Sequence, residues 1–292
     1  MKPCTPAHPT ASPGPFGTSL RHALANAFAN AFANSFANSF ANLFANSCVT
    51  ASPLILAITL AGCASGPPPR DWQINAFEAQ ETALDTWLQG NDKLADAEFA
   101  RARDAVASSA RLDLLARLTL GRCAAQIASL NNLPAAGNPF CPEFTPLGVD
   151  ARAEEKAYFD YLTGRWQGIT PTLLPAQHRP LLALVASPPA TANGANSKAD
   201  PTGKPAPLAA DAQLLSAISD PLSRLVACGV LLQRGQLSPD GIALAVDTAS
   251  TQGWRRPLLA WLGVQGQRAE ATGNAELAAR VKRRMAFLAP AK

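Results

Sequence analysis

The sequence has few of the side chains that most catalytic and metal sites require. Histidine occurs three times in 292 residues, and His178 is the only histidine after residue 22. A histidine-based zinc cluster or a His-Glu-x-x-His helix is therefore excluded from the remainder of the chain. Gly-x-Ser-x-Gly, Cys-x-x-Cys and Gly-x-Gly-x-x-Gly motifs and phosphate-binding loops are also missing. We accordingly expect no metal site, no cofactor and no catalytic constellation.

Charged residues are almost absent from the beginning of the chain, where residues 1–62 contain only Lys2 and Arg21. This segment carries near-identical tetrapeptides of the Phe-Ala-Asn-Ser type within residues 25–46 and ends in the uncharged apolar run 53–62. The run is too short to span a bilayer, which takes about 20 apolar residues, and it fits the apolar core of a signal peptide. We therefore expect residues 1–62 to be an export signal that is removed.

The apolar run leads directly into Leu60-Ala61-Gly62-Cys63. These residues resemble the lipobox of bacterial lipoprotein precursors, in which a branched apolar residue and two small residues precede a cysteine. The resemblance implies that Cys63 receives a lipid after cleavage, and that residues 63–70 tether the protein to the membrane. The next residue is Ala and not Asp, which in such lipoproteins favours the outer membrane, facing the periplasm. The alternative is a short buried strand with an incidental cysteine.

Three cysteines follow the lipobox, namely Cys123, Cys141 and Cys228. The expected envelope compartment is oxidising, so a disulfide would persist there. Cys141 lies in a proline-rich loop just after the helical segment that contains Cys123, and closing this loop would contribute about 3 kcal/mol. We predict a Cys123–Cys141 disulfide. Cys228 lies in an apolar helical run, which favours a buried thiol.

The charge after residue 62 is nearly balanced. Because Lys2 and Arg21 precede this point, 23 of the 25 basic residues and all 21 acidic residues follow it, for a formal net charge of +2. Binding of nucleic acid would require a strongly basic domain, so we expect no nucleic-acid partner. The 230 residues that follow the signal are sufficient for one domain or two small ones.

Apolar residues recur at helical spacing through most of this part. Residues 71–186 contain several amphipathic runs, the first of which ends at Gly90. Residues 187–207 have no Leu, Ile, Val or aromatic residue, so we expect a flexible linker there. Residues 208–292 form a second helical part. Its expected helix ends are glycines, namely Gly235, Gly253 and Gly273.

One of the predicted helices resembles part of a repeat family. Ala95, Phe99 and Ala102, preceded by Gly90, are similar to the second helix of a tetratricopeptide repeat, although the first-helix Trp-Leu-Gly-Tyr signature is absent. The glycine-marked helix ends repeat after 38 residues, near that family's 34. We predict an all-α fold of antiparallel helical hairpins that form a bundle or a short tetratricopeptide-like solenoid.

Trp254 and Trp261 share one helical face, with Arg255 and Arg256 beside them. Tryptophan and arginine are typical of interface hot spots, so these four residues are the candidate partner-binding site. The alternative is that both indoles pack in the core between hairpins.

These observations favour a lipid-anchored helical scaffold or adaptor that binds another cell-envelope protein. One alternative is an enzyme that acts on the cell wall with a lone carboxylate, such as Glu143, Glu154 or Glu155. A third possibility is a carrier whose helical cavity holds an apolar ligand. His178 lies in a proline-broken helix, where we expect it to face solvent.

Overall fold

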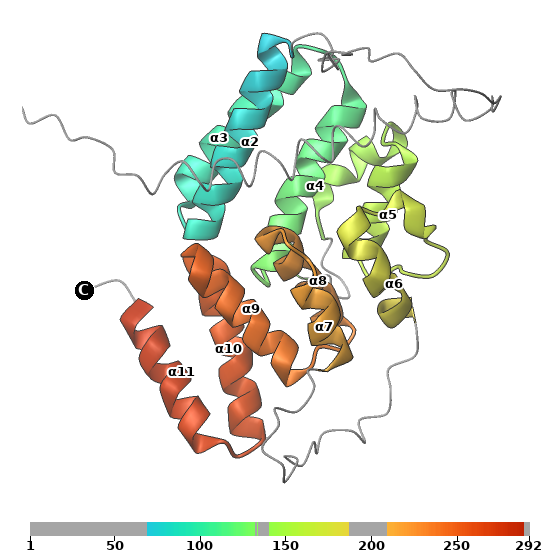
Figure 1. Ribbon diagram of the computed structural model, residues 1–292. Helices are drawn as coiled ribbons and strands as arrows, with labels where there is room; N and C mark the ends of the chain where they lie inside the picture. Colours follow the sequence, from blue (N-terminus) through green and yellow to red (C-terminus); the bar gives the residue numbers. More distant parts are fainter. Residues whose placement is uncertain (1–68, 132, 134–139, 187–208, 289–292) are drawn as a thin grey trace, which may run out of the picture. The chain divides into compact units, whose positions relative to one another are not determined.

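The computed structural model describes residues 69–131, 133, 140–186 and 209–288 (Figure 1). These residues contain helices and turns and no strand, so the expected all-α fold is confirmed. The predicted signal segment, nearly all of the predicted tether and the predicted linker 187–207 lie outside the described residues. None of the helices in the described part has the length and hydropathy that a bilayer crossing requires.

The first two helices form a close hairpin. α2 (Asp71–Gln89) ends at Gly90, whose positive φ of 96° turns the chain, and the Asn91 side chain accepts a hydrogen bond from the Leu94 N–H to begin α3 (Asp92–Ala107). Small side chains in the shared core allow the two helices to approach closely. This core, to which α4 (Leu112–Ala128) adds one leucine, consists of Ala76, Ala79, Ala83, Phe99, Ala102, Val106 and Leu118.

Short helices follow α4, because prolines interrupt the helical pattern. The two longer ones are α5 (Ala153–Leu162) and α6 (Arg179–Ala186). The remaining turns are 3-10 helices, namely η2 (Pro142–Phe144), η3 (Pro146–Val149), η4 (Pro171–Leu173) and η5 (Ala176–His178).

The C-terminal helices have clear start and stop residues. The Asp220 and Ser238 side chains each accept a hydrogen bond from the third residue after them, and proline follows each cap. The three glycines expected at helix ends all adopt positive φ. These helices are α7 (Ala210–Ser216), α8 (Pro221–Gln233), α9 (Pro239–Gln252), α10 (Arg255–Ala271) and α11 (Ala275–Leu288).

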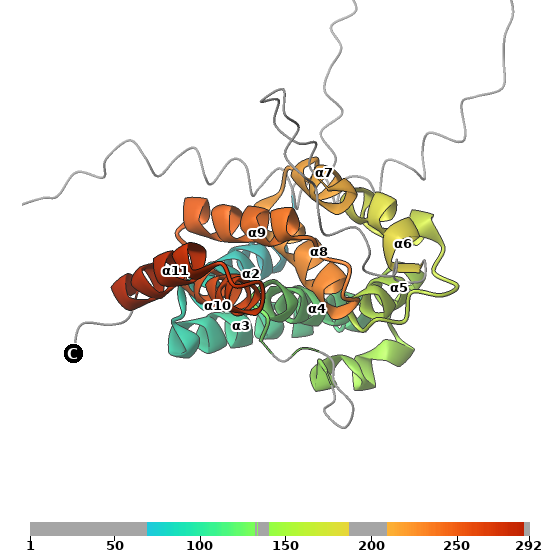
Figure 2. The same cartoon turned by 90° about the horizontal axis from the view of Figure 1, so that it is seen from below.

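Helices from both sides of residues 187–208 share one hydrophobic core. α4 and α8 lie side by side in both views (Figures 1 and 2), and their buried leucines and isoleucine belong to the same cluster. At Gly229 of α8 an added Cβ would lie 2.7 Å from the backbone oxygen of Ile127 in α4. Only glycine permits this close approach of the two helices.

Candidate functional site

The Cys123 and Cys141 side chains form a disulfide, with the two Cα atoms 5.7 Å apart. Both residues are buried, and the bond ties the segment just before η2 to α4. Cys228 of α8 is a free, fully buried thiol. Burial raises the pKa of this thiol above its usual range, so it is neutral and unreactive. Cys63 lies outside the described residues.

Trp254 and Trp261, half of the candidate partner-binding site, belong to the main core. Trp261 is 0% exposed, and its indole Nε1–H donates to the backbone oxygen of Ala128 at 2.9 Å. Trp254 is also buried. The interpretation of these indoles as exposed anchors is therefore wrong, because their helical face packs inward. A shared face alone does not distinguish a core from an interface.

Arg255 and Arg256, the other half of that candidate site, bind parts of their own chain. Arg256 stacks 3.9 Å above the Trp87 ring, donates to the Trp87 oxygen at 2.7 Å and pairs with Asp92. Arg255 donates to the backbone oxygen of Leu288 at 2.7 Å. These arginines join α10 to the α2–α3 hairpin and to the end of α11, so the four residues do not form an exposed binding patch.

The three carboxylates considered for catalysis have different environments. Glu155 is buried, forms an ion pair with Arg117 at 2.6 Å and accepts the Arg152 N–H at 3.1 Å. Its role is to connect α5 with α4 and to cap α5. Glu143 and Glu154 are exposed. Among the described residues, no group of three or more His, Cys, Asp or Glu side chains is arranged to hold a metal ion.

His178 is buried, which corrects the expectation that it faces solvent. η5 turns the imidazole toward the rings of Tyr158 and Tyr161, whose centroids lie 5.8 Å and 5.2 Å away. Neither imidazole nitrogen has a hydrogen-bond partner among the described residues. Loss of solvation lowers the pKa of His178 to about 4, so the ring is neutral near pH 7.

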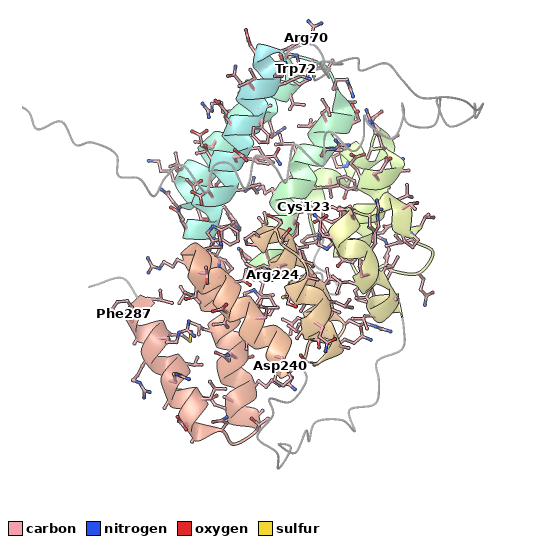
Figure 3. All side chains as sticks on the ribbon, viewed as in Figure 1. Arg70, Trp72, Cys123, Arg224, Asp240 and Phe287 are labelled. Atoms are coloured by element: carbon pink, nitrogen blue, oxygen red, sulfur yellow. A yellow bond between two sulfur atoms is a disulfide. The ribbon has the colours of Figure 1, made fainter. Side chains whose placement is uncertain are left out.

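An open groove lies where the last three helices meet. α9 and α10 contribute Ser250 and Leu258, and the end of α11 contributes Arg283, Arg284, Phe287 and Leu288. The groove encloses about 390 Å³. Figure 3 shows Phe287 near the C-terminal end of α11, and its side chain is 90% exposed.

Phe287 is not among the predicted site residues, although the sequence contains a signal for it. The apolar stripe of α11 runs through Leu277, Val281, Met285 and Leu288, and Phe287 lies off this stripe. A large aromatic residue outside the core-facing stripe of an amphipathic helix indicates a possible contact surface.

Comparison with protein-family models, with curated proteins and with solved structures finds no match to this chain. The resemblances to lipoprotein precursors and to tetratricopeptide repeats therefore rest on the sequence motifs alone.

Proposed function

We propose that this protein is a lipid-anchored helical adaptor of the bacterial outer membrane, which faces the periplasm and binds another cell-envelope protein. The observation that carries the proposal is the apolar run 53–62 that leads into the complete motif Leu60-Ala61-Gly62-Cys63. The Cys123–Cys141 disulfide supports it, because such bonds persist in an oxidising envelope compartment.

The arrangement of the C-terminal helices supports a binding role. Successive helices from α8 to α11 pack against one another, and stacked hairpins of this kind expose surfaces that repeat proteins use to bind partners. The finer likeness to tetratricopeptide repeats is part of this proposal. A catalytic role has less support, since Glu155 is engaged with Arg117 and Arg152.

Metabolic labelling with an alkyne fatty acid tests the anchor. In bacterial cells that express the full chain, we expect label on the wild type and none on Cys63→Ser. Two or three acyl chains give stable anchoring, so the wild type should sediment with outer membranes. Cys48→Ser is the matched control, because it removes a thiol outside the motif and should be labelled normally. Label retained on Cys63→Ser would falsify the anchor.

A further inference from the structure

The end of α11 brings two unpaired cations to the groove between α9, α10 and α11. Arg283 and Arg284 line this groove, and neither forms an ion pair with a carboxylate of the described residues. Lys282, one position earlier, pairs with Glu270 at 2.9 Å and is neutralised within the hairpin. Arg280 also has no ion pair among the described residues, but it does not line the groove. Two of the three cations of α11 that lack such a pair therefore lie beside the groove.

The same groove presents apolar surface. Leu258 lies on its inner wall, Leu288 lies at its end, and Phe287 stands almost fully exposed beside them. The Arg255 guanidinium holds the Leu288 carbonyl, so the end of α11 is fixed to the start of α10. Because the backbone at the end of α11 is held in this way, less of it has to be ordered when a ligand binds.

We propose that this groove receives an amphipathic helix of a partner protein that carries Asp or Glu beside Leu or Phe side chains. The inference rests on the adaptor function proposed above and names the chemistry of the partner. The helix would place its apolar face on Phe287 and Leu288, with one side chain inserted toward the buried Leu258. Its carboxylates would pair with Arg283 and Arg284. The groove volume is near the small end of the range for binding pockets, which fits a few side chains.

Two other occupants fit less well. A symmetric pairing of two copies through this groove would bring Arg283 and Arg284 of both copies together, and this like-charge contact is unfavourable. An anionic membrane surface would satisfy the arginines, but Leu258 is a buried wall residue that a flat surface would not reach.

Two designed peptides provide the test. Each is a fluorescein-labelled, 18-residue amphipathic helix of about five turns with one Leu/Phe face, and the flanking positions are Glu in one peptide and Lys in the other. Fluorescence anisotropy with the full chain in detergent micelles measures their affinities. We expect the Glu peptide to bind at least about tenfold more tightly than the Lys peptide, and added salt should reduce the difference.

Charge reversal and truncation then locate the site. Arg283→Glu combined with Arg284→Glu should lower the affinity for the Glu peptide by about tenfold or more and raise the affinity for the Lys peptide. Lys93→Glu combined with Arg103→Glu, on exposed positions of α3, makes the same charge change elsewhere and should leave both affinities unchanged. Phe287→Ala should lower the affinity for the Glu peptide by about tenfold or more, as is typical of a hot-spot residue.

The inference is overturned if neither peptide binds, if the two peptides bind equally, or if the α3 control weakens the Glu peptide as much as the α11 reversal. It is also overturned if vesicles containing phosphatidylglycerol, and not the Glu peptide, bind in a way that depends on Arg283 and Arg284. Fatty-acid labelling at Cys63 is an independent measurement. Failure of the peptide assay with normal labelling rejects the groove, and loss of labelling with normal peptide binding rejects the anchor.

Discussion

The contact between α4 and α8 differs from the α10–α11 hairpin in how completely it is closed. At the first contact, Gly229 lies against Ile127 so closely that a methyl group would overlap its backbone. At the second, an added Cβ at Gly266 of α10 would lie 3.2 Å from Val281 Cγ1, a longer distance than at Gly229. At Gly263 of α10 an added Cβ would have no heavy atom of the described residues within 4 Å, and the Phe287 side chain of α11 is 90% exposed. The first contact joins distant parts of the chain, and the second leaves an aromatic side chain exposed.

This difference separates stability from binding. Close packing at the α4–α8 contact buries apolar surface and leaves little room for change. The inner residues of the α10–α11 hairpin, such as Leu262 and Val281, belong to the same main core. The exposed face of α11 lies outside that core, so we expect it to vary without loss of the fold. We therefore expect substitutions near α4 and α8 to change stability, and those on the exposed face of α11 to change binding.

The largest expected effect is that of Trp261→Ala. Trp261 links α10 to α4, because its fully buried indole donates to the Ala128 oxygen. Removing this side chain leaves a cavity and an unpaired acceptor, and we expect a loss of about 3–5 kcal/mol in the free energy of unfolding. Urea unfolding followed by circular dichroism measures this loss.

Phe287→Ala is the matched control for the tryptophan substitution. It also removes a large aromatic side chain from the C-terminal helices, but from an exposed position, so the stability should change by less than about 0.5 kcal/mol. If both substitutions destabilise the protein equally, α11 is packed as tightly as α4 and α8, and the proposed difference between the two contacts is incorrect.

A second prediction concerns pH and the buried His178. Its pKa is about 4 in the folded protein, against an ordinary value of 6.5, because the charged imidazole is poorly solvated. As the pH falls below about 6.5, the unfolded chain binds a proton that the folded chain does not, so stability decreases. We expect a loss of about 3 kcal/mol from this group between neutral pH and about pH 4.

The contribution of His178 is measured as a difference between two pH profiles. His178→Gln removes the titration and keeps a polar side chain, so its stability should fall less steeply than that of the wild type over the same pH range. The other titratable groups contribute equally to both profiles, so their contributions cancel in the difference. Parallel profiles for the two proteins would show that the imidazole is solvated in the folded state.

The third prediction concerns the disulfide on α4. Cys123→Ser combined with Cys141→Ser should lower the free energy of unfolding by about 3 kcal/mol, because the bond closes a loop of 18 residues in the unfolded chain. The control is the wild type with a reductant, whose stability should approach that of the double variant. A reductant that leaves the wild type unchanged would show that the bond does not form in solution.

The sequence alone predicts the helices of this fold better than their packing partners. Gly90 and Gly253 end helices as expected, because only the positive φ of a helix stop favours glycine at those positions. The contact between Gly229 and Ile127 was not predictable, since it joins helices 102 positions apart in the chain. Helical periodicity shows which face is apolar and does not show what covers it.

The same limitation explains the two errors at the candidate sites. The spacing of Trp254 and Trp261 gives a shared face, which favours an interface as much as a core. In the structure both indoles lie in the main core, and Trp261 donates to the Ala128 oxygen of α4. The prolines around His178 break the helix, which predicts a solvent-exposed ring, but the resulting short turn directs the ring toward Tyr161. In both cases, residues that are distant in the sequence cover the side chain and make it buried.

The fourth prediction compares the substitution of glycine by alanine at Gly229 in α8 and at Gly263 in α10. Alanine normally stabilises a helix interior relative to glycine by about 0.5–1 kcal/mol. At Gly229, however, the new methyl group would lie 2.6 Å from Ile127 Cγ2 and 2.7 Å from the Ile127 oxygen, so α4 and α8 must separate. We expect Gly229→Ala to destabilise the protein by about 1–3 kcal/mol, as overpacking does in other cores.

Gly263→Ala makes the same change in α10, where the methyl group meets no heavy atom of the described residues within 4 Å. The substitution then acts only through the backbone, because alanine restricts the unfolded chain and fits the helical conformation. This variant should therefore be more stable than the wild type by about 0.5–1 kcal/mol. Urea unfolding of both variants measures the change in the free energy of unfolding, which should be negative for Gly229→Ala and positive for Gly263→Ala. If Gly263→Ala is destabilising, this position of α10 lacks the open space that the structure gives it; if Gly229→Ala is stabilising, the α4–α8 contact has room for a methyl group.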